Sequence, residues 1–342
     1  MNKFRVIDLF AGCGGLSLGL YLAGWKGVFA IEKNPCAYST LYYNLIEKKH
    51  HFDWPDWLPQ KPLDILEVNK LYTEQLKKLR GSIDLVAGGP PCQGFSMAGR
   101  RVKDDIRNQL VFAYINFISM VMPKLILFEN VKGFTYAFDK KKDPNSIPYS
   151  TIVTEKLKEL EYDVCPQVID FSQFGIPQRR KRFILVGILK GKKDAAEQFI
   201  TKLWKNREQF FSENNLPEHP SIADAISDLL RSNGEVDTPD RKGFKSGIYG
   251  KPSNEYQIYM RKNVQEIIPQ SHSFAHHCKE KVHCFENLLT YYPIRNKRID
   301  GKEREKWGIH QRGLTVLDAK SIAPTITNMP DDYLHYQEPR IM

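Results

Sequence analysis

Cys92 is the residue whose surroundings point most directly to chemistry. The segment 86-VAGGPPCQGFS-96 follows an apolar run and places this cysteine behind two prolines and two glycines. Pro90 and Pro91 have fixed φ angles, so the loop is stiff, and it is too exposed to serve as a core position. A thiolate is the strongest nucleophile among unmodified side chains, although it needs a positive or dipolar environment to form near neutral pH. We therefore predict that Cys92 is a nucleophile.

Charged groups that could assist this thiol follow two later apolar runs. Glu129 stands near the end of the run 124-KLILFEN-130, where a partly buried carboxyl can serve as an acid or a hydrogen-bond donor. Four consecutive cations enter the run 182-RFILVGI-188. Because side chains alternate along a strand, Arg180 and Arg182 are expected on one side of it and able to face the site.

A glycine-rich turn predicts a cofactor site. In 8-DLFAGCGGLSLGL-20, Gly12 and Gly14 allow a tight turn and close approach of a ligand to the backbone at a helix N-terminus. Glu32 follows at the end of the next apolar run, where a carboxylate can bind a ribose diol, and Asp64 could reach an adenine amino group. These residues together predict a cofactor that contains a nucleoside. A nicotinamide dinucleotide remains the alternative, weakened because Ser17 stands where that fingerprint has its third glycine.

Histidines do not complete either of two other kinds of site. A cysteine hydrolase needs a Cys–His pair, but seven of the nine histidines come after residue 218 and the other two, His50 and His51, lie outside the segments above. Apart from His272 with His276 or His277, the cluster 272-HSFAHHCKEKVHC-284 lacks the paired ligand spacings of structural zinc sites. We therefore expect no metal.

The elements that position these residues alternate as in a doubly wound α/β domain with a mostly parallel sheet. Apolar runs predict strands at 4–10, 26–32, 83–88, 124–130 and 182–188, and periodic stretches predict helices at 15–24, 36–47, 109–121 and 151–162. Ligands bind at the carboxyl ends of such strands, where the candidate residues fall. Residues 1–190 are expected to form this domain. Residues 191–342 lose the rhythm and are expected to form a smaller, loop-rich domain, with 190–220 as a connecting region.

Composition agrees with an intracellular protein that has a polyanionic partner. The 342 residues carry a formal charge of +10, and the excess lies mostly in residues 1–190, with 27 Lys and Arg against 19 Asp and Glu. Six cysteines without secretory context indicate a reducing compartment. The sequence shows neither a membrane span nor a signal peptide, so we expect a cytoplasmic protein that does not bind membranes.

Four motifs in this order, 7-IDLFAGCGGLSLGL-20, 88-GGPPCQGFS-96, 129-ENV-131 and 178-QRRKR-182, resemble those of the DNA cytosine-5 methyltransferases, particularly the bacterial restriction-modification type. The resemblance implies an S-adenosylmethionine-dependent methyltransferase fold and an enzyme that flips cytosine out of double-stranded DNA. It implies that residues 191–342 recognise the DNA target, that a cognate restriction endonuclease belongs to the same system, and that the protein is found at the bacterial nucleoid.

The resemblance also assigns roles residue by residue. Cys92 would attack carbon 6 of cytosine, Glu129 would hold ring nitrogen 3 and the amino group, and Arg180 and Arg182 would orient the base. The positions that match the substrate site are Gln93, Ser96, Asn130 and Val131. The positions that match the methyl-donor pocket are Phe10, Gly12, Gly14, Leu16, Glu32, Lys33, Asp64, Ile65, Gly89, Pro91 and Leu110.

The sequence departs from this family at its end. Complete relatives continue past a segment like 336-YQEPRIM-342 into two further motifs that close the donor pocket. Three explanations are open: a second small subunit supplies them, the gene is truncated, or the chain is a fragment. We expect the second subunit, because the break falls between two units. The alternative functions are an inactive or regulatory DNA-binding subunit and an RNA cytosine-5 methyltransferase.

Overall fold

The computed structural model describes residues 4–91, 108–137, 146–239, 241–309, 313–327 and 332–342. The chain divides into two compact units. The first comprises residues 1–169 and 181–204, and the second comprises residues 170–180 and 205–342. This division lies apart from the boundary at residue 190 that the sequence pattern suggests, because the segment 170–180 belongs to the second unit and a long helix crosses from one unit to the other.

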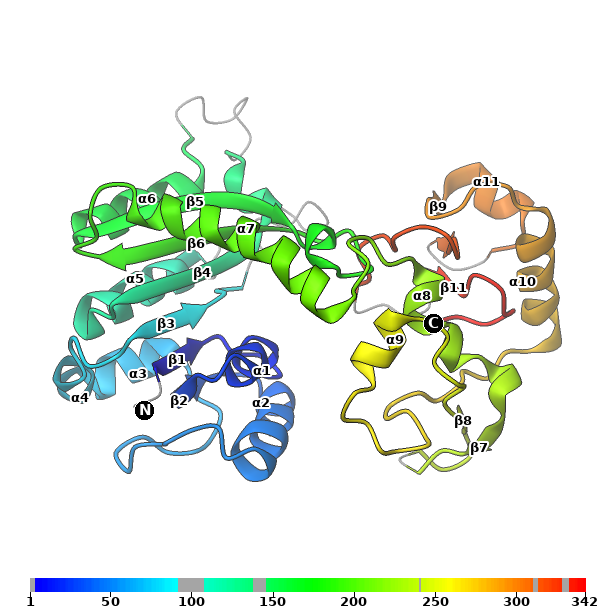
Figure 1. The fold of residues 1–342 in the computed structure, drawn as a ribbon, viewed down its shortest axis with the longest axis horizontal. Coiled ribbons are helices and arrows are strands. Elements are labelled where there is room, and N and C mark those ends of the chain that lie inside the picture. Colours follow the sequence, from blue (N-terminus) through cyan, green and yellow to red (C-terminus); the bar gives the residue numbers. More distant parts are fainter. Residues whose placement is uncertain (1–3, 92–107, 138–145, 240, 310–312, 328–331) are drawn as a thin grey trace. The chain divides into compact units, whose positions relative to one another are not determined.

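A six-stranded sheet forms the centre of the first unit, in the order β2-β1-β3-β4-β6-β5 (Figure 1). Strands β2, β1, β3 and β4 run parallel to one another, whereas β6 runs antiparallel to β4. The expected doubly wound, mostly parallel sheet is thus confirmed. The strands are β1 (Arg5–Leu9), β2 (Lys26–Ile31), β3 (Leu85–Gly88), β4 (Leu125–Val131), β5 (Tyr162–Asp170) and β6 (Lys181–Leu189).

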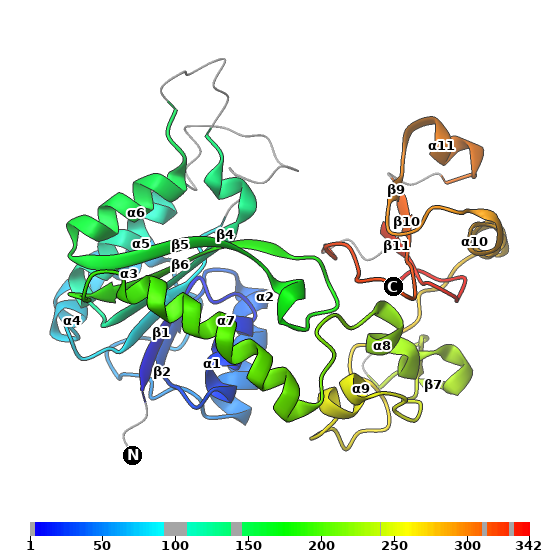
Figure 2. The same cartoon turned by 45° about the horizontal axis from the view of Figure 1, so that its top comes forward.

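Helices cover both faces of this sheet because consecutive strand residues point to opposite sides. On β1, Val6 belongs to a cluster that receives Leu16 and Leu20 of α1, whereas Ile7 belongs to the main core with residues of α3, α5 and α6. Figures 1 and 2 show these layers. The helices are α1 (Gly15–Leu22), α2 (Pro35–Leu41), the π-helix η1 (Tyr42–Lys48), α3 (Ile65–Leu71), α4 (Thr73–Lys78), α5 (Asn108–Val121), the 3₁₀ helix η2 (Lys132–Thr135), α6 (Tyr149–Glu159) and α7 (Ala195–Asn214).

The second unit is built from short elements, and its described residues include two small clusters of buried apolar side chains. Its sheets are the antiparallel pair of β7 (Glu235–Asp237) and β8 (Lys245–Gly247) and a three-stranded sheet of β9 (Arg298–Ile299), β10 (Leu314–Val316) and β11 (Tyr333–Leu334). Its helices are the 3₁₀ turns η3 (Phe171–Phe174), η4 (Ser227–Leu229) and η5 (Arg231–Asn233), with α8 (Ile222–Ile226), α9 (Glu255–Met260), α10 (Lys279–Tyr291) and α11 (Gly301–Lys306).

The segment 190–220 is not simply a connecting region, because most of it forms the 20-residue helix α7. Ala196, Ile200 and Phe211 are its buried apolar residues. Charged residues surround them on the other faces, so the narrow apolar stripe is a weak sequence signal. Strand β5 and helices α3 and α4 were also not predicted. In the described part of the chain, no helix combines the length and apolar character that crossing a bilayer requires.

Candidate active site

Three parallel strands bring the predicted residues to one edge of the sheet. Leu9 of β1 pairs with Gly88 of β3, and Gly88 pairs with Phe128 of β4. The next residues, Phe10 and Gly89, leave the sheet at its carboxyl edge, where α/β folds bind ligands, and Glu129 lies beside them in β4, where it pairs with Ile184 of β6. The prediction that Glu129 lies one strand away from the cysteine loop is confirmed at the level of the strands.

Glu129 forms an ion pair with Arg182 across strands β4 and β6. Arg182 Nε lies 2.9 Å from Glu129 Oε1, and the arginine side chain is only 14% exposed. The other carboxylate oxygen lies beside the cysteine loop, since a Cβ built on Gly89 would come within 2.7 Å of Oε2. Only glycine at position 89 therefore leaves the carboxylate where it is. A charge-assisted pair of this kind fixes the orientation of the carboxylate.

Asn130 holds the start of the cysteine loop against β4. Its side chain is 1% exposed, its Nδ2 donates to the carbonyl oxygen of Pro90 at 3.1 Å, and its Oδ1 accepts from the N–H of Val131 at 2.9 Å. Both ends of the amide are therefore bonded within the protein. Val131 is half-buried beside it. The assignment of Asn130 and Val131 to the substrate site remains a prediction, and these hydrogen bonds also give Asn130 a role in holding the loop.

Replacing Asn130 with alanine is expected to lower both stability and turnover. The change removes the hydrogen bond of the buried Pro90 carbonyl, at a cost of about 1–3 kcal/mol in the free energy of unfolding, and also that of the half-buried Val131 N–H. Asn69→Ala is the matched control, because Asn69 is also buried and donates to a backbone carbonyl, that of Ala113, away from this edge. Urea unfolding should show losses of similar size, whereas turnover should fall only in Asn130→Ala. Equal turnover in the two variants would contradict the positioning role.

Cys92, Gln93 and Ser96 lie outside the described residues, so their predicted roles stay predictions. The segment before them is described up to Pro91, with Pro90 buried and Gly89 and Pro91 half-buried. The cysteines at 13, 36, 165, 278 and 284 are free thiols. Cys13, Cys36 and Cys278 are exposed, and Cys165 and Cys284 are partly buried.

The glycine loop after β1 is closed by Glu32. Its Oε2 accepts from the N–H of Gly12 at 2.8 Å and its Oε1 accepts from the N–H of Asn34 at 2.7 Å. Phe10, Gly12 and Gly14 have φ angles of 58°, 56° and 89°, so the chain turns through left-handed conformations there. A Cβ on Gly12 would meet nothing within 4 Å, whereas one on Gly14 would come within 2.7 Å of Leu45. Gly12 thus leaves open space for a ligand, and Gly14 permits packing.

Lys33 and Asp64 meet at the same edge, at the N-terminus of α3. Lys33 Nζ donates to Asp64 Oδ2 at 2.7 Å, and Asp64 Oδ1 accepts from the N–H of Leu66 at 2.9 Å and so caps the helix. Burial opposes the charged form of Asp64, but the hydrogen bonds from Lys33 and Leu66 outweigh it and lower the pKa of Asp64. The hydrogen bond with Asp64 raises the pKa of Lys33 in turn. Both residues therefore keep their charges near neutral pH.

Asp8 is a residue of this edge that the sequence analysis passed over. It is 1% exposed, its Oδ2 accepts from the hydroxyl of Ser17 at 2.5 Å, and its Oδ1 has no hydrogen-bond partner among the described residues. Burial raises the pKa of Asp8 to about 7, although hydrogen bonds from Ser17 act in the opposite direction. The signal that could have identified Asp8 is a carboxylate inside the apolar strand 5-RVIDL-9.

Asp8 is expected to make the apo protein less stable as the pH rises. Between pH 4 and pH 7 the folded chain keeps a proton that the unfolded chain releases, so the free energy of unfolding falls across this window and levels off above it. One pKa unit corresponds to about 1.4 kcal/mol, which sets an upper limit of ~4 kcal/mol for the full effect. Asp8→Asn lacks this titration. Urea unfolding at pH 5 and pH 8 measures the free energy of unfolding of both chains. Relative to the parent chain, the variant should be more stable at pH 8 than at pH 5, and parallel pH profiles would contradict the assignment.

The remaining residues predicted to line the methyl-donor pocket lie around the same edge. Leu16 is half-buried in α1, Ile65 is buried at the start of α3, and Leu110 is half-buried in the first turn of α5. With the open space at Gly12 and the unpartnered oxygen of Asp8, these residues fit a ligand that has an apolar part and several polar atoms. Arg180 belongs to the second unit, so the predicted pairing of its role with that of Arg182 stays a prediction. Among the described residues, no three His, Cys, Asp or Glu side chains are placed to hold a metal ion.

Comparison with known proteins gives one consistent family. The model of the C-5 cytosine-specific DNA methylases matches residues 4–340. The chain is 32% identical over 320 residues to the type II methyltransferase M.DdeI of Desulfomicrobium norvegicum, covering 94% of this chain and 69% of that protein. It is 33% identical over 270 residues to the type II methyltransferase M.XorII of Xanthomonas oryzae pv. oryzae, covering 75% of this chain but 53% of that protein.

A solved structure supports the fold. It is described as a DNA modification methyltransferase encoded within an Escherichia coli prophage, and it matches with a TM-score of 0.60 and 24% identity, over 99% of this chain and 86% of that one. At this identity the similarity establishes the architecture alone. The family model matches nearly the whole length of the chain, and the identity to M.DdeI agrees with it. The chain therefore belongs to the C-5 cytosine-specific DNA methylase family.

Proposed function

We propose that this protein transfers a methyl group from S-adenosylmethionine to carbon 5 of a flipped cytosine in a specific DNA duplex, through a covalent adduct on Cys92, within a type II restriction-modification system. The observation that supports this proposal best is the Glu129–Arg182 pair beside Gly89, because it places an oriented carboxylate at the start of the cysteine loop. S-adenosylmethionine would supply the electrophilic methyl group when it is bound and would leave as S-adenosylhomocysteine, whose sulfur would keep the electron pair of the broken sulfur–methyl bond.

The residues at the carboxyl edge divide the work of binding this donor. Glu32 is the carboxylate assigned to the ribose diol, and Asp64 and Ile65 are assigned to the adenine, with Phe10, Leu16 and Leu110 as apolar neighbours. The N–H groups at the start of α1 lack a side-chain cap, since Gly14 occupies the capping position. Open space at Gly12 allows the donor to reach the backbone there.

In the proposed reaction Cys92 acts twice, first as the nucleophile that adds to the ring and then as the leaving group. The Cys92 thiolate adds to carbon 6 of cytosine, which makes carbon 5 nucleophilic enough to accept the methyl group. Glu129, in its protonated form, donates its proton to ring nitrogen 3, where the addition places negative charge, and its other oxygen accepts a hydrogen bond from the amino group. Arg182 holds Glu129 in place, and the proton returns to Glu129 when the thiolate leaves. Loss of the proton from carbon 5 to a base then expels the Cys92 thiolate and restores the aromatic ring.

Incorporation of a labelled methyl group into mixed-sequence DNA tests this function. Label in 5-methylcytosine, located at one recurring sequence by bisulfite sequencing, is the expected result. Label in RNA but not in DNA, or in no nucleic acid under any of the conditions below, would refute the proposal. The search for the target sequence uses the same reaction products.

The second subunit expected from the sequence stays a prediction and is tested in the same assay. The reaction is run with the purified chain alone and with the product of the adjacent reading frame added. Activity that depends on the added product supports a two-subunit enzyme. Full activity of the single chain would contradict it.

A further inference from the structure

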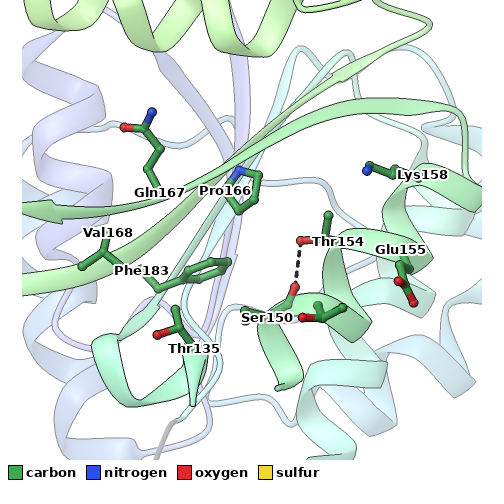
Figure 3. A pocket seen from close by; sticks show the side chains of 10 residues that line it. Thr135, Ser150, Thr154, Glu155, Lys158, Pro166, Gln167, Val168 and Phe183 are labelled. Carbon is green, nitrogen blue, oxygen red and sulfur yellow. Dashed lines mark hydrogen bonds between the residues drawn. The ribbon is translucent and has the colours of Figure 1, made fainter. Parts of the chain in front are cut away.

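Asp8 lies on the face of the central sheet that α1 covers. Val6, two residues earlier on β1, packs in the cluster that receives α1, and alternation along the strand places Asp8 on the same side. The cavity of about 400 Å³ drawn in Figure 3 lies on the other face, since Phe183, which lines it, belongs to the main core with Ile7. The sheet therefore separates Asp8 from that cavity and leaves it directly beneath the glycine loop.

The carboxylate of Asp8 is buried without a positive charge beside it. The side chain is 1% exposed and makes no ion pair within the described part of the chain, where its Oδ1 also lacks a hydrogen-bond partner. The ionisable groups that interact with it are Glu32, which follows β2, and Tyr114 of α5. Burial raises the pKa of Asp8 to about 7, and the charge of Glu32 acts in the same direction. A buried carboxylate normally has a cation as its partner, and Asp8 lacks one among these residues.

A capping role explains the position of Asp8 but not its charge. Ser17 is the third residue of α1, and the capping position of this helix is occupied by Gly14, which has no side chain. The hydroxyl and the backbone N–H of Ser17 donate to Asp8, so the strand supplies the cap that the glycine cannot. Because an asparagine side chain also caps helices, this role does not require an acid.

The proposed methyl donor carries the positive charge that Asp8 lacks. Its sulfonium is bonded to carbon 5′ of the ribose whose diol is assigned to Glu32, so the sulfur is one methylene away from that ring. Asp8 and Glu32 interact electrostatically, and Asp8 stands two residues before Phe10 and four before Gly12, where the loop leaves open space. After methyl transfer the sulfur is neutral. Donor and product therefore differ by one positive charge at the part of the ligand nearest to Asp8.

We propose that Asp8 makes the site prefer S-adenosylmethionine over S-adenosylhomocysteine, because its ionised carboxylate beneath the glycine loop attracts the sulfonium of the donor and not the neutral sulfur of the product. The proposal rests on the proposed function, which names the donor. Asp8 acts through its charge and does not touch the reacting atoms, so it determines specificity rather than catalysing the reaction. At an effective dielectric constant of about 20, charges ~10 Å apart change binding on the order of 10-fold.

The pH dependence of this preference gives the first test. Calorimetry measures Kd for donor and product at pH 6 and pH 8, in the parent chain and in Asp8→Asn, with the product of the adjacent reading frame added if activity depends on it. Asp8 is mostly protonated at pH 6 and mostly ionised at pH 8, so the ratio of product Kd to donor Kd should rise about 5-fold in the parent chain relative to the variant. The amino groups of the ligands titrate equally with both chains and cancel in this comparison.

Two control variants separate charge from capping. Asp84→Asn removes a carboxylate at the opposite edge of the sheet, where Asp84 precedes β3 and pairs with Lys124 at 2.8 Å, and its ratio should follow that of the parent chain. Ser17→Ala keeps the charge of Asp8 but removes a hydrogen bond that lowers its pKa, so the rise in the ratio should move to higher pH. If Asp8→Asn and Ser17→Ala instead weaken donor and product by the same factor at both pH values, Asp8 is only a cap and the proposal is wrong.

Proton release provides a second test that needs no variant. At pH 6.5, calorimetry of the parent chain in two buffers of different ionisation enthalpy should show about half a proton more released on binding the donor than on binding the product, because the sulfonium favours ionised Asp8. Sinefungin, which has an ammonium-bearing carbon in place of the sulfonium, should behave like the donor although it has no transferable methyl group. Equal proton release with all three ligands would overturn the proposal.

The outcomes distinguish this proposal from the proposed function. If the protein methylates DNA but the ratio of dissociation constants is the same in the parent chain and in Asp8→Asn at both pH values, the role of Asp8 is wrong and the enzymatic assignment stands. If no methylation occurs but the ratio depends on Asp8 as expected, the enzymatic assignment fails and the role of Asp8 stands. A protein that binds neither ligand under any of these conditions overturns both.

Discussion

Replacing Cys92 with alanine is expected to lower the rate of methyl transfer at least about 10³-fold, because the reaction then lacks the group that adds to carbon 6. Carbon 5 of cytosine is a poor nucleophile until a covalent bond forms at carbon 6. Binding of duplex DNA should change little, since the thiol acts on the base after the protein has bound the duplex. Single-turnover transfer from labelled S-adenosylmethionine measures the first effect, and a binding isotherm measures the second.

Trapping identifies the nucleophile directly. DNA that contains 5-fluorocytosine cannot lose fluorine as a cation, so the parent chain should remain joined to it through Cys92 after methyl transfer. Cys92→Ala and Cys92→Ser should form no adduct, whereas Cys36→Ala, which removes an exposed free thiol elsewhere in the first unit, should trap like the parent chain. An adduct in Cys92→Ser, or one mapped to another cysteine, would contradict the mechanism. The same experiment distinguishes an enzyme from an inactive DNA-binding subunit.

Glu129→Gln is expected to reduce single-turnover methyl transfer about 10²- to 10⁴-fold, the range typical of a positioned acid or base. The amide keeps the shape of the carboxylate but loses the charge that pairs with Arg182 at 2.9 Å. Arg182→Gln should also impair transfer, since it frees the carboxylate to move. Because the two side chains act as a unit, the double variant should be about as slow as the slower single variant rather than slower by the product of both effects.

The control for this pair is another ion pair of the first unit. Lys190 and Glu161 are 3.7 Å apart and both are largely exposed, so Glu161→Gln removes a carboxylate from a pair that contributes little. Its rate of methyl transfer should equal that of the parent chain. Additive effects of Glu129→Gln and Arg182→Gln would show that the observed pair does not operate as a unit in the reaction.

The strands of the first unit and the ends at which chemistry occurs could be predicted from the sequence. All five predicted strands are present, and Phe10, Gly89 and Glu129 stand at the carboxyl ends of β1, β3 and β4. Short apolar runs punctuated by glycine, proline and charge indicate buried parallel strands, and the geometry of such sheets places their carboxyl ends together. The same local signals failed for α7 and β5, because charged residues interrupt the apolar stripe of α7 and β5 is a partly exposed edge strand.

By itself, the sequence determined which residue types stand at the strand ends, and hence the family and the kind of reaction to expect. The tertiary structure decided which of them meet: Glu129 with Arg182, Asn130 with Pro90, Lys33 with Asp64, and Asp8 with Ser17. Most of these partners are 31 to 53 residues apart in the chain. They meet because β3 and β6 both pair with β4 and because α3 returns to the edge of β2. Strand order depends on how the whole core packs, and a local pattern of residues does not contain that information.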